Sequence, residues 1–315
     1  MNNTVKISLL SLLCLALIAL FLFTGLIGQW DYVFPRRLYK VAAIAITGAG
    51  IAFSTLVFQT VTNNRILTPS IIGLDSLYLL FQTFIMFVFG SSSRLVRNAE
   101  LNFLLSTACM LVFVALLYRL MFKREGRHLY FLLLIGLVLG TLFGSLSTFM
   151  QVLIDPSEFL ILQGKMFASF NNVNTDLLPL AFGVIIAVLL YGMRFLGILD
   201  VLSLGQDHAV NLGVAYDAIV KRLLVVAAVL VSLSTALVGP ITFLGLLVVN
   251  VAYQLMVTYR HRALLASSIL ISIAALIGGQ LLVERVFTFS TTISVIVNFA
   301  GGSYFLYLLL RENKL

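Results

Sequence analysis

The sequence predicts an all-α integral membrane protein with about ten transmembrane helices, and three observations lead to this fold class. Of the 315 residues, 61% are apolar and only 10% are charged, and the mean hydropathy is +1.10. Soluble domains are about half apolar and a quarter charged. The apolar residues form runs long enough to cross a hydrocarbon core, which takes about 20 helical residues. The basic residues stand in short groups between these runs, as the positive-inside rule expects.

Each expected helix is an apolar run that ends at charged residues or at a stretch rich in Pro, Gly or Asn. The first run lacks a small-x-small cleavage site near its end, so we expect a retained helix rather than a removed signal peptide. The runs leave no room for a folded extramembrane domain, which predicts one transmembrane domain over 1–315. In order, the helices are expected at 7–27, 38–60, 72–90, 99–121, 129–151, 177–196, 219–238, 241–258, 263–283 and 292–310.

The distribution of Lys and Arg predicts the orientation of this domain. An even number of spans places both termini on one side of the membrane. That side would carry 13 basic residues and the other side 7. Because the side richer in Lys and Arg is normally cytoplasmic, we expect both termini to be cytoplasmic.

Three connecting segments differ from plain loops. Residues 63–70 interrupt the chain between the second and third expected helices on the cytoplasmic side. The cytoplasmic segment 197–217 is too polar to span the membrane but keeps helical apolar spacing, which predicts a short helix outside the bilayer. On the opposite side, 155–176 is long enough for one or two interfacial helices.

No arrangement of residues indicates hydrolysis or group transfer. The only Gly-Lys pair, Gly164-Lys165, is followed by Met166, so the chain has no phosphate-binding P-loop. The three histidines, at 128, 208 and 261, lie far apart and without metal-ligand spacing. We therefore expect no catalytic centre and no metal site.

The positions of the acidic residues bear on ion-coupled transport. Ionisable groups inside a bilayer are costly and usually functional, yet nearly all twelve acids fall at expected helix ends or in loops. Asp75, at the start of the third helix, is the nearest exception. An ion-coupled carrier is less favoured for this reason, although a site made of backbone carbonyls stays open.

The fifth expected helix carries small residues at four-residue spacing: Gly136, Gly140 and Gly144, followed by Ser147 and Thr148. Such a stripe favours close packing against a neighbouring helix. It would also suit the smooth, weakly polar wall of a translocation path. The two interpretations are compatible, since helices that line a path also pack against neighbours.

The stretch from Leu199 to Val214, LDVLSLGQDHAVNLGV, resembles the cytoplasmic coupling segment of the FecCD family. These proteins are the permease subunits of type II bacterial ABC importers for iron-siderophores, haem and vitamin B12. Other parts of the chain are similar to the same family. They are Pro35-Arg36 before the second helix, Gln59, Asn63, Pro69, Ser70 and Gly73 after it, Gly239-Pro240-Ile241 with Phe243, Gly245 and Leu246, His261, and Gly301 with Phe305, Leu308 and Leu309.

The resemblance implies a BtuC-like permease fold in the bacterial cytoplasmic (inner) membrane. It implies a second permease subunit, two cytoplasmic ABC ATPases that bind ATP and Mg, and a periplasmic or surface siderophore-binding protein as partners. The chain itself would bind no cofactor and no nucleic acid, and would contact lipid. A short amphipathic helix can press its apolar side into a groove of the ATPase, and the coupling residues would be Leu202, Ser203, Leu204, Gly205, Gln206, Asp207, His208, Ala209, Leu212 and Gly213.

The resemblance also suggests two surfaces beyond the coupling segment. On the outer side, Arg36, Arg37 and Arg285 are expected to pair with carboxylates of the binding protein. A path that releases a large anionic complex should not hold it tightly. We therefore expect a weakly polar translocation path lined by Gly140, Gly144, Ser147, Thr148 and Asn298.

The chain also departs from the family pattern at Val33, Val249-Asn250, Tyr253 and Ser303. Such losses suggest a permease that works beside a non-identical partner, because one copy can lose positions that the other retains. Glu284-Arg285-Val286-Phe287 and Ala300-Gly301-Gly302 look most like permeases for catecholate siderophores. Vitamin B12 and haem stay open as cargo. An ion-coupled secondary transporter and a membrane scaffold without transport are the alternatives from other classes.

Overall fold

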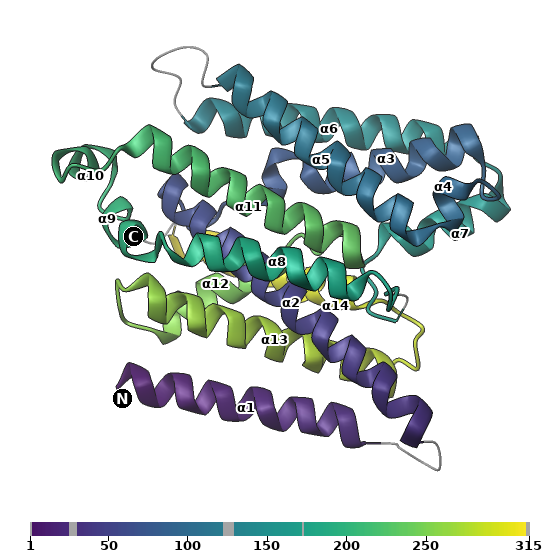
Figure 1. The fold of residues 1–315 in the computed structure, drawn as a ribbon, viewed down its shortest axis with the longest axis horizontal. Helices are drawn as coiled ribbons and strands as arrows, with labels where there is room; N and C mark the ends of the chain where they lie inside the picture. Colours follow the sequence, from purple (N-terminus) through teal and green to yellow (C-terminus); the bar gives the residue numbers. More distant parts are fainter. Residues whose placement is uncertain (1, 25–29, 122–128, 172, 313–315) are drawn as a thin grey trace.

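The computed structural model describes residues 2–24, 30–121, 129–171 and 173–312, and these ranges are built from α-helices and one 3₁₀ helix, η1 (Figure 1). The elements in order are α1 (Asn3–Phe23), α2 (Trp30–Thr62), η1 (Pro69–Ile72), α3 (Leu74–Phe89), α4 (Arg94–Arg97), α5 (Ala99–Met121), α6 (Leu129–Leu153), α7 (Pro156–Met166), α8 (Leu178–Met193), α9 (Leu196–Leu202), α10 (Gln206–Asn211), α11 (Tyr216–Val238), α12 (Leu244–Leu255), α13 (His261–Arg285) and α14 (Ile293–Glu312).

The expected all-α membrane fold is confirmed, and each of the ten expected spans has a helix at its place: α1, α2, α3, α5, α6, α8, α11, α12, α13 and α14. Their lengths differ more than the apolar runs predict. Within the described ranges, six helices are long and apolar enough to cross a membrane, and α8 with α9 makes a seventh. The remaining apolar helices α3, α12 and α14 are shorter. The 12 residues of α12 reach only about 18 Å along the axis.

The second helix is much longer than the expected 38–60. It covers 33 residues, which corresponds to about 50 Å. The expected start at 38 is wrong because Pro35 and the charges around it are typical of a break between helices, whereas α2 begins at Trp30. Pro35 is the sixth residue of α2, beyond the first turn that proline favours, so the helix loses one i→i−4 hydrogen bond there and nevertheless continues to Thr62.

The core is organised around the C-terminal part of α2, which is buried almost without interruption from Val41 to Thr62. Small residues bring its neighbours close. A Cβ added at Gly48 would lie 2.8 Å from the hydroxyl of Ser272 on α13, and one at Gly50 would lie 2.9 Å from the hydroxyl of Ser234 on α11. Without a hydrophobic driving force between helices in lipid, such close backbone approach is a main source of packing energy.

Polar side chains connect α3 to its two neighbours inside the apolar band. The Gln82 amide donates to Asn102 (2.8 Å) and Ser106 (2.9 Å) of α5, and Thr83 and Ser147 of α6 share a hydrogen bond of 2.9 Å. Interhelical hydrogen bonds of this kind contribute about 0.6 kcal/mol each on average in membrane proteins. They hold α3, α5 and α6 in a defined arrangement.

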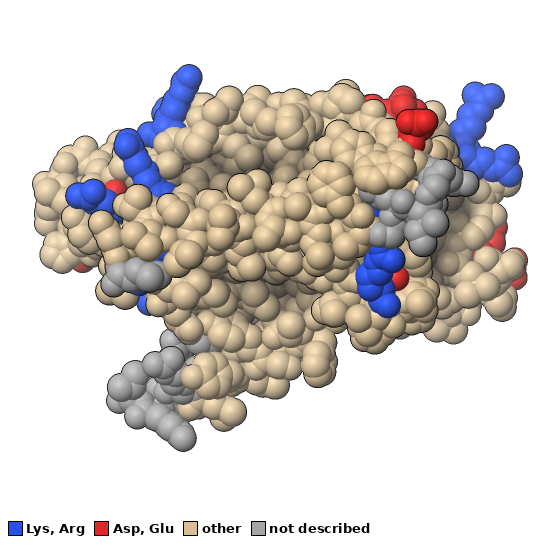
Figure 2. Space-filling view, turned by 90° about the horizontal axis from the view of Figure 1, so that it is seen from below, with Lys and Arg blue, Asp and Glu red and all other residues tan. Residues whose placement is uncertain are grey.

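The charged residues gather at the two ends of the molecule. In the face seen in Figure 2, Lys, Arg, Asp and Glu stand at the left and right ends and leave an uncharged band between them. Both chain termini lie at the end that carries α10, as expected from an even number of spans (Figure 1). We call this end the terminal end, and we call the opposite end, which carries α4 and α7, the far end.

Candidate functional site

The segment 197–217 forms two short helices rather than the single expected one. α9 continues α8 after a bend of 55°, and α10 follows after a turn at Ser203–Gly205. Gly205 and Gly213, at the two ends of α10, have φ angles of 98° and 83°, which residues with a Cβ rarely adopt. These glycines let the chain reverse on both sides of α10, which projects from the terminal end in Figure 1.

The apolar residues of this segment divide into an anchored set and an exposed set. Leu199, Leu202 and Ala209 are fully buried against the membrane helices. Leu204 and Leu212 are 57% and 64% exposed, and together with His208 and Asn211 they line a surface depression of about 320 Å³. The segment therefore has one face fixed to the bundle and one apolar face open to a partner.

The anchored face includes a polar connection that the sequence analysis did not foresee. Asp200 on α9 accepts hydrogen bonds from the backbone N–H and from Nδ1 of His261, both at 2.7 Å. The other ring nitrogen of His261 lies 2.9 Å from the hydroxyl of Thr60 on α2. Asp200 thus caps the N-terminus of α13 and connects the segment to two central helices. Both residues occur in the family-like stretches, but sequence spacing carries no sign that they meet.

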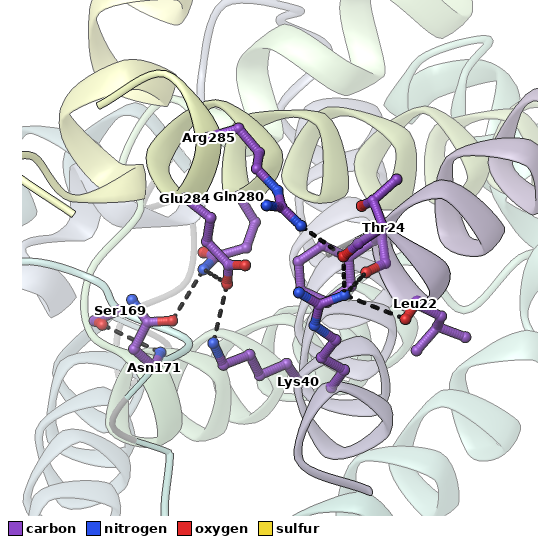
Figure 3. A network of polar contacts seen from close by, with 10 residues as sticks. Leu22, Thr24, Lys40, Ser169, Asn171, Gln280, Glu284 and Arg285 are labelled. Atoms are coloured by element: carbon purple, nitrogen blue, oxygen red, sulfur yellow. Dashed lines mark hydrogen bonds and ion pairs between the residues drawn. The ribbon is translucent and has the colours of Figure 1, made fainter. Parts of the chain in front are cut away.

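At the far end, two of the three arginines expected to dock a binding protein have partners inside the chain. Arg37 donates to the carbonyl oxygens of Phe21 (2.9 Å), Leu22 (3.2 Å) and Thr24 at the C-terminus of α1. Arg285 donates to the Thr24 carbonyl as well (Figure 3). Helix C-termini attract cations because their last carbonyls lack helical partners, so these two side chains fasten α1 to α2 and α13.

Arg36 has a different environment. Its guanidinium lies 4.1 Å from the ring centroid of Tyr32, and the residue is exposed. It borders a surface depression of about 570 Å³ that also includes Lys40, Asn171 and Glu284. Of the three expected docking arginines, Arg36 and Arg285 are exposed, and only Arg36 has no hydrogen bond to another of the described residues.

The floor of this depression is a polar network drawn in Figure 3. Lys40 forms an ion pair of 3.0 Å with Glu284, and Gln280 donates to Glu284 (2.9 Å) and to Asn171 (3.0 Å). The network connects α2, α13 and the segment after α7. It holds Glu284 in place, so that carboxylate is already paired with a cation.

The residues expected to line a path have unequal surroundings. A Cβ at Gly140 would lie 3.1 Å from the Cα of Gly73, so Gly140 belongs to a close contact between α6 and the start of α3. Ser147 is buried and bonded to Thr83. Gly144 has nothing within 4 Å of its Cβ position, and Thr148 is exposed. Close packing is therefore shown for Gly140 and Ser147, whereas Gly144 and Thr148 do not take part in such a contact.

Asn298, the last residue expected along the path, lies on α14. Its side-chain oxygen accepts a hydrogen bond of 3.4 Å from the backbone N–H of Phe243, just before α12. The residue is half-buried. Asn298 thereby satisfies a free N–H at the start of a helix, and its amide group remains partly accessible.

Asp75 is buried at the start of α3, where its carboxylate oxygens lie 3.4 Å from the hydroxyl of Thr235 and 3.2 Å from that of Thr242. Among the described residues, no three His, Cys, Asp or Glu side chains gather in a way that could hold a metal ion. His128 lies outside the described residues.

Comparisons with known proteins assign the family. The FecCD transport family matches residues 4–311. The petrobactin import system permease protein YclO of Bacillus subtilis (strain 168) is 62% identical over 100% of this chain and 99% of its own length. The petrobactin import system permease protein FatC of Bacillus anthracis is 38% identical over 90% of this chain and 80% of its own length.

A solved structure shows the same fold. It is a chain of an ABC transporter described as of metal-chelate type, in an inward-facing conformation, with a TM-score of 0.83 and 23% identity. The match covers 98% of this chain and 99% of that one. The expected BtuC-like fold is thereby confirmed. The chain belongs to the FecCD transport family and is a permease subunit, a non-catalytic transmembrane component of an ABC importer.

Proposed function

We propose that this chain is one of two non-identical permeases in an importer that carries a ferric siderophore of the petrobactin type across the bacterial cytoplasmic membrane. The observation that carries the proposal is the 62% identity to a petrobactin import permease over essentially the full length of both chains. Catecholate chemistry of the cargo, expected from the sequence, is part of the proposal. Vitamin B12 import is a second candidate, with 28% identity to the permease BtuC of Vibrio cholerae.

The pairing of non-identical permeases is supported by the relatives in two organisms. Bacillus subtilis has two permease proteins named for petrobactin import, YclO and YclN, to which this chain is 62% and 26% identical. Bacillus anthracis likewise has FatC and FatD, at 38% and 28%. In both organisms the chain is more similar to one member of the pair. It would occupy that position and require a partner of the other type.

The coupling role of α9 and α10 rests on their two faces. The buried residues fix the segment to the bundle, and the exposed Leu204 and Leu212 offer an apolar surface at the terminal end. A groove on an ATPase that holds this surface would gain a hydrophobic contact. ATP and Mg would be bound by the ATPase, and closure of the ATPase pair would move the segment as a rigid body.

The outer surface and the path complete the proposal. The terminal end faces the cytoplasm by the positive-inside rule, so Arg36 at the far end would meet the binding protein from outside. Arg37 and Arg285 would support that surface by holding the end of α1. Along the path, Gly144, Thr148 and Asn298 keep accessible surface, whereas Gly140 and Ser147 would shape the path through packing.

Reconstitution tests this function. The chain would be co-expressed with the second permease, the ATPase and the binding protein, and the complex placed in lipid vesicles. We expect ATP-dependent uptake of iron as ferric petrobactin, and no uptake when the P-loop lysine of the ATPase is replaced. Full uptake with this chain as the only permease would refute the pairing. Uptake of vitamin B12 or haem in place of ferric petrobactin would refute the cargo.

A further inference from the structure

The outer surface of the bundle carries an apolar groove between α8 and α11, two helices that run alongside each other in the middle of Figure 1. The groove encloses about 470 Å³. Apart from the hydroxyl of one tyrosine, its side chains offer aliphatic and aromatic surface. Its lining includes Gly183, Ala187 and Tyr191 of α8 and Val225, Val226 and Val229 of α11.

The shape of the groove depends on Gly183. A Cβ at this position would meet nothing within 4 Å, so the absent side chain leaves open space between the helices. Of the valines of α11 that line this space, Val225 is 46% exposed, Val229 is half-buried and Val226 is buried. In a membrane, a furrow of this kind would favour lipid chains over water, because water would find almost no hydrogen-bond partners there.

The end of the groove nearest to the terminal end has two arginines. Arg222 precedes Val225 and Val226 by three and four positions, so it lies on the same face of α11, one turn beyond the groove. Arg194 follows Tyr191 by three positions at the end of α8 and lies beyond the groove in the same way. Both arginines are exposed, and no ion pair with an acidic residue is found for either in the described part of the chain.

Tyr191 lies between the groove and Arg194. It is 42% exposed, and its ring packs edge-on against Phe195 at 5.4 Å between centroids. Tyrosine is enriched where hydrocarbon meets the headgroups, because its ring is apolar and its hydroxyl is polar. The order along α8 is therefore apolar furrow, aromatic boundary and then cation, which is the order of acyl chain, glycerol level and phosphate in a phospholipid.

We propose that the groove between α8 and α11 is a binding site for one anionic phospholipid, with an acyl chain in the groove and the phosphate between Arg194 and Arg222. The occupant follows from charge complementarity, since two unpaired cations at one end of an apolar furrow match an anionic headgroup attached to a hydrocarbon chain. Basic pockets between helices on the cytoplasmic side of membrane proteins recognise such lipids. The site is separate from the coupling surface formed by Leu204 and Leu212.

Native mass spectrometry on the purified importer complex tests the proposal. Phosphatidylglycerol and phosphatidylcholine with the same acyl chains would be added, and the occupancy of the first bound lipid compared. We expect phosphatidylglycerol to bind about thirtyfold more tightly, as two basic residues near an anionic headgroup imply. The double variant Arg194→Gln, Arg222→Gln should lose this preference. Arg262→Gln, an exposed arginine at the same end but on α13, should retain it.

The groove is tested separately from the charges. Gly183→Leu fills the furrow and should lower the binding of both lipids, whereas Gly278→Leu, another glycine with open space at its Cβ, should leave both unchanged. Equal binding of the two lipids to the unaltered complex would overturn the proposal. So would displacement of the lipid by glycerol phosphate or inorganic phosphate alone, which would indicate a phosphate site without a lipid chain. A helix of another subunit found in the groove would overturn it as well.

Discussion

Asp200 and His261 form a two-point contact in which one carboxylate oxygen accepts both the backbone N–H and the ring Nδ1 of the histidine, each at 2.7 Å. Asp200 belongs to the segment proposed to contact the ATPase, and His261 begins a central helix. If the proposed coupling role holds, this contact would join the segment that the ATPase moves to the central helices of the bundle.

Replacement of Asp200 by Ala should uncouple ATP hydrolysis from transport. The variant loses two hydrogen bonds to a charged group, worth about 1.5–3 kcal/mol each, and α9 is freed from α13. We expect ATP hydrolysis by the assembled complex to persist while uptake in vesicles falls about tenfold. Asp217→Ala, an exposed acid at the same end, is the matched control. Equal loss of hydrolysis and uptake would show that Asp200 supports assembly rather than transmission.

The exposed leucines of the coupling segment should decide whether the ATPase binds. Leu204→Glu with Leu212→Glu places two charges on an apolar contact, which removes the burial of both side chains, about 1.5–3 kcal/mol each. We expect the ATPase to be lost during purification while the permease remains monodisperse. Val257→Glu alters an exposed apolar residue outside the segment and should leave the complex intact. Retention of the ATPase by the double variant would place its contact elsewhere.

Although Arg36 and Arg37 are neighbours in sequence, their variants should affect different properties: docking of the binding protein for Arg36 and stability of the fold for Arg37. Arg36→Glu reverses an exposed charge and should weaken binding of the substrate-binding protein about tenfold, with an unchanged unfolding temperature. Arg37→Glu removes the donor to three α1 carbonyls and should lower the unfolding temperature. Binding kinetics on an immobilised complex and a thermal scan measure the two effects. Identical behaviour of the two variants would contradict this division.

Replacements of two glycines of α6 should likewise affect different properties, one the stability of the fold and the other transport. Gly140→Leu forces a side chain against the backbone of Gly73, and overpacking costs about 1–3 kcal/mol. We expect lower thermal stability and poor yield. Gly144→Leu meets open space, so stability should be kept, and uptake should fall if the residue borders the path. Unchanged uptake in a stable Gly144→Leu complex would remove Gly144 from the proposed path.

The parts of the fold that depend on composition and local pattern were predictable from the sequence. Apolar runs located all ten main helices, and the polar segment 197–217 was correctly predicted to be helical. The length of α2 was not predictable, because Pro35, Arg36, Arg37 and Lys40 resemble a loop, yet the helix continues through them with the loss of one hydrogen bond at Pro35. The extra helix in 197–217 depended on Gly205, whose positive φ only the three-dimensional structure reveals.

The candidate surfaces show a different limit. Sequence similarity indicated which arginines and glycines to consider, but not what each one contacts. Arg285 and Arg37 meet the end of α1 because two distant helices converge there, and Asp200 meets His261 across 61 positions. Such pairs form through tertiary packing, and the local periodicity of the sequence does not predict them. The groove between α8 and α11 could not be predicted from the sequence either, because it forms between two helices whose individual sequences give no sign of it.

The length of α2 has a consequence for how the two ends of the molecule communicate. Its first turns carry Arg36, Arg37 and Lys40 at the far end, and its last turns carry Thr60, which contacts His261 and through it Asp200. One helix about 50 Å long thus reaches from the surface proposed to meet the binding protein to the residues that hold the proposed coupling segment. A displacement of either end would be transmitted along the same helix. Arrival of cargo and closure of the ATPases would therefore both act on α2.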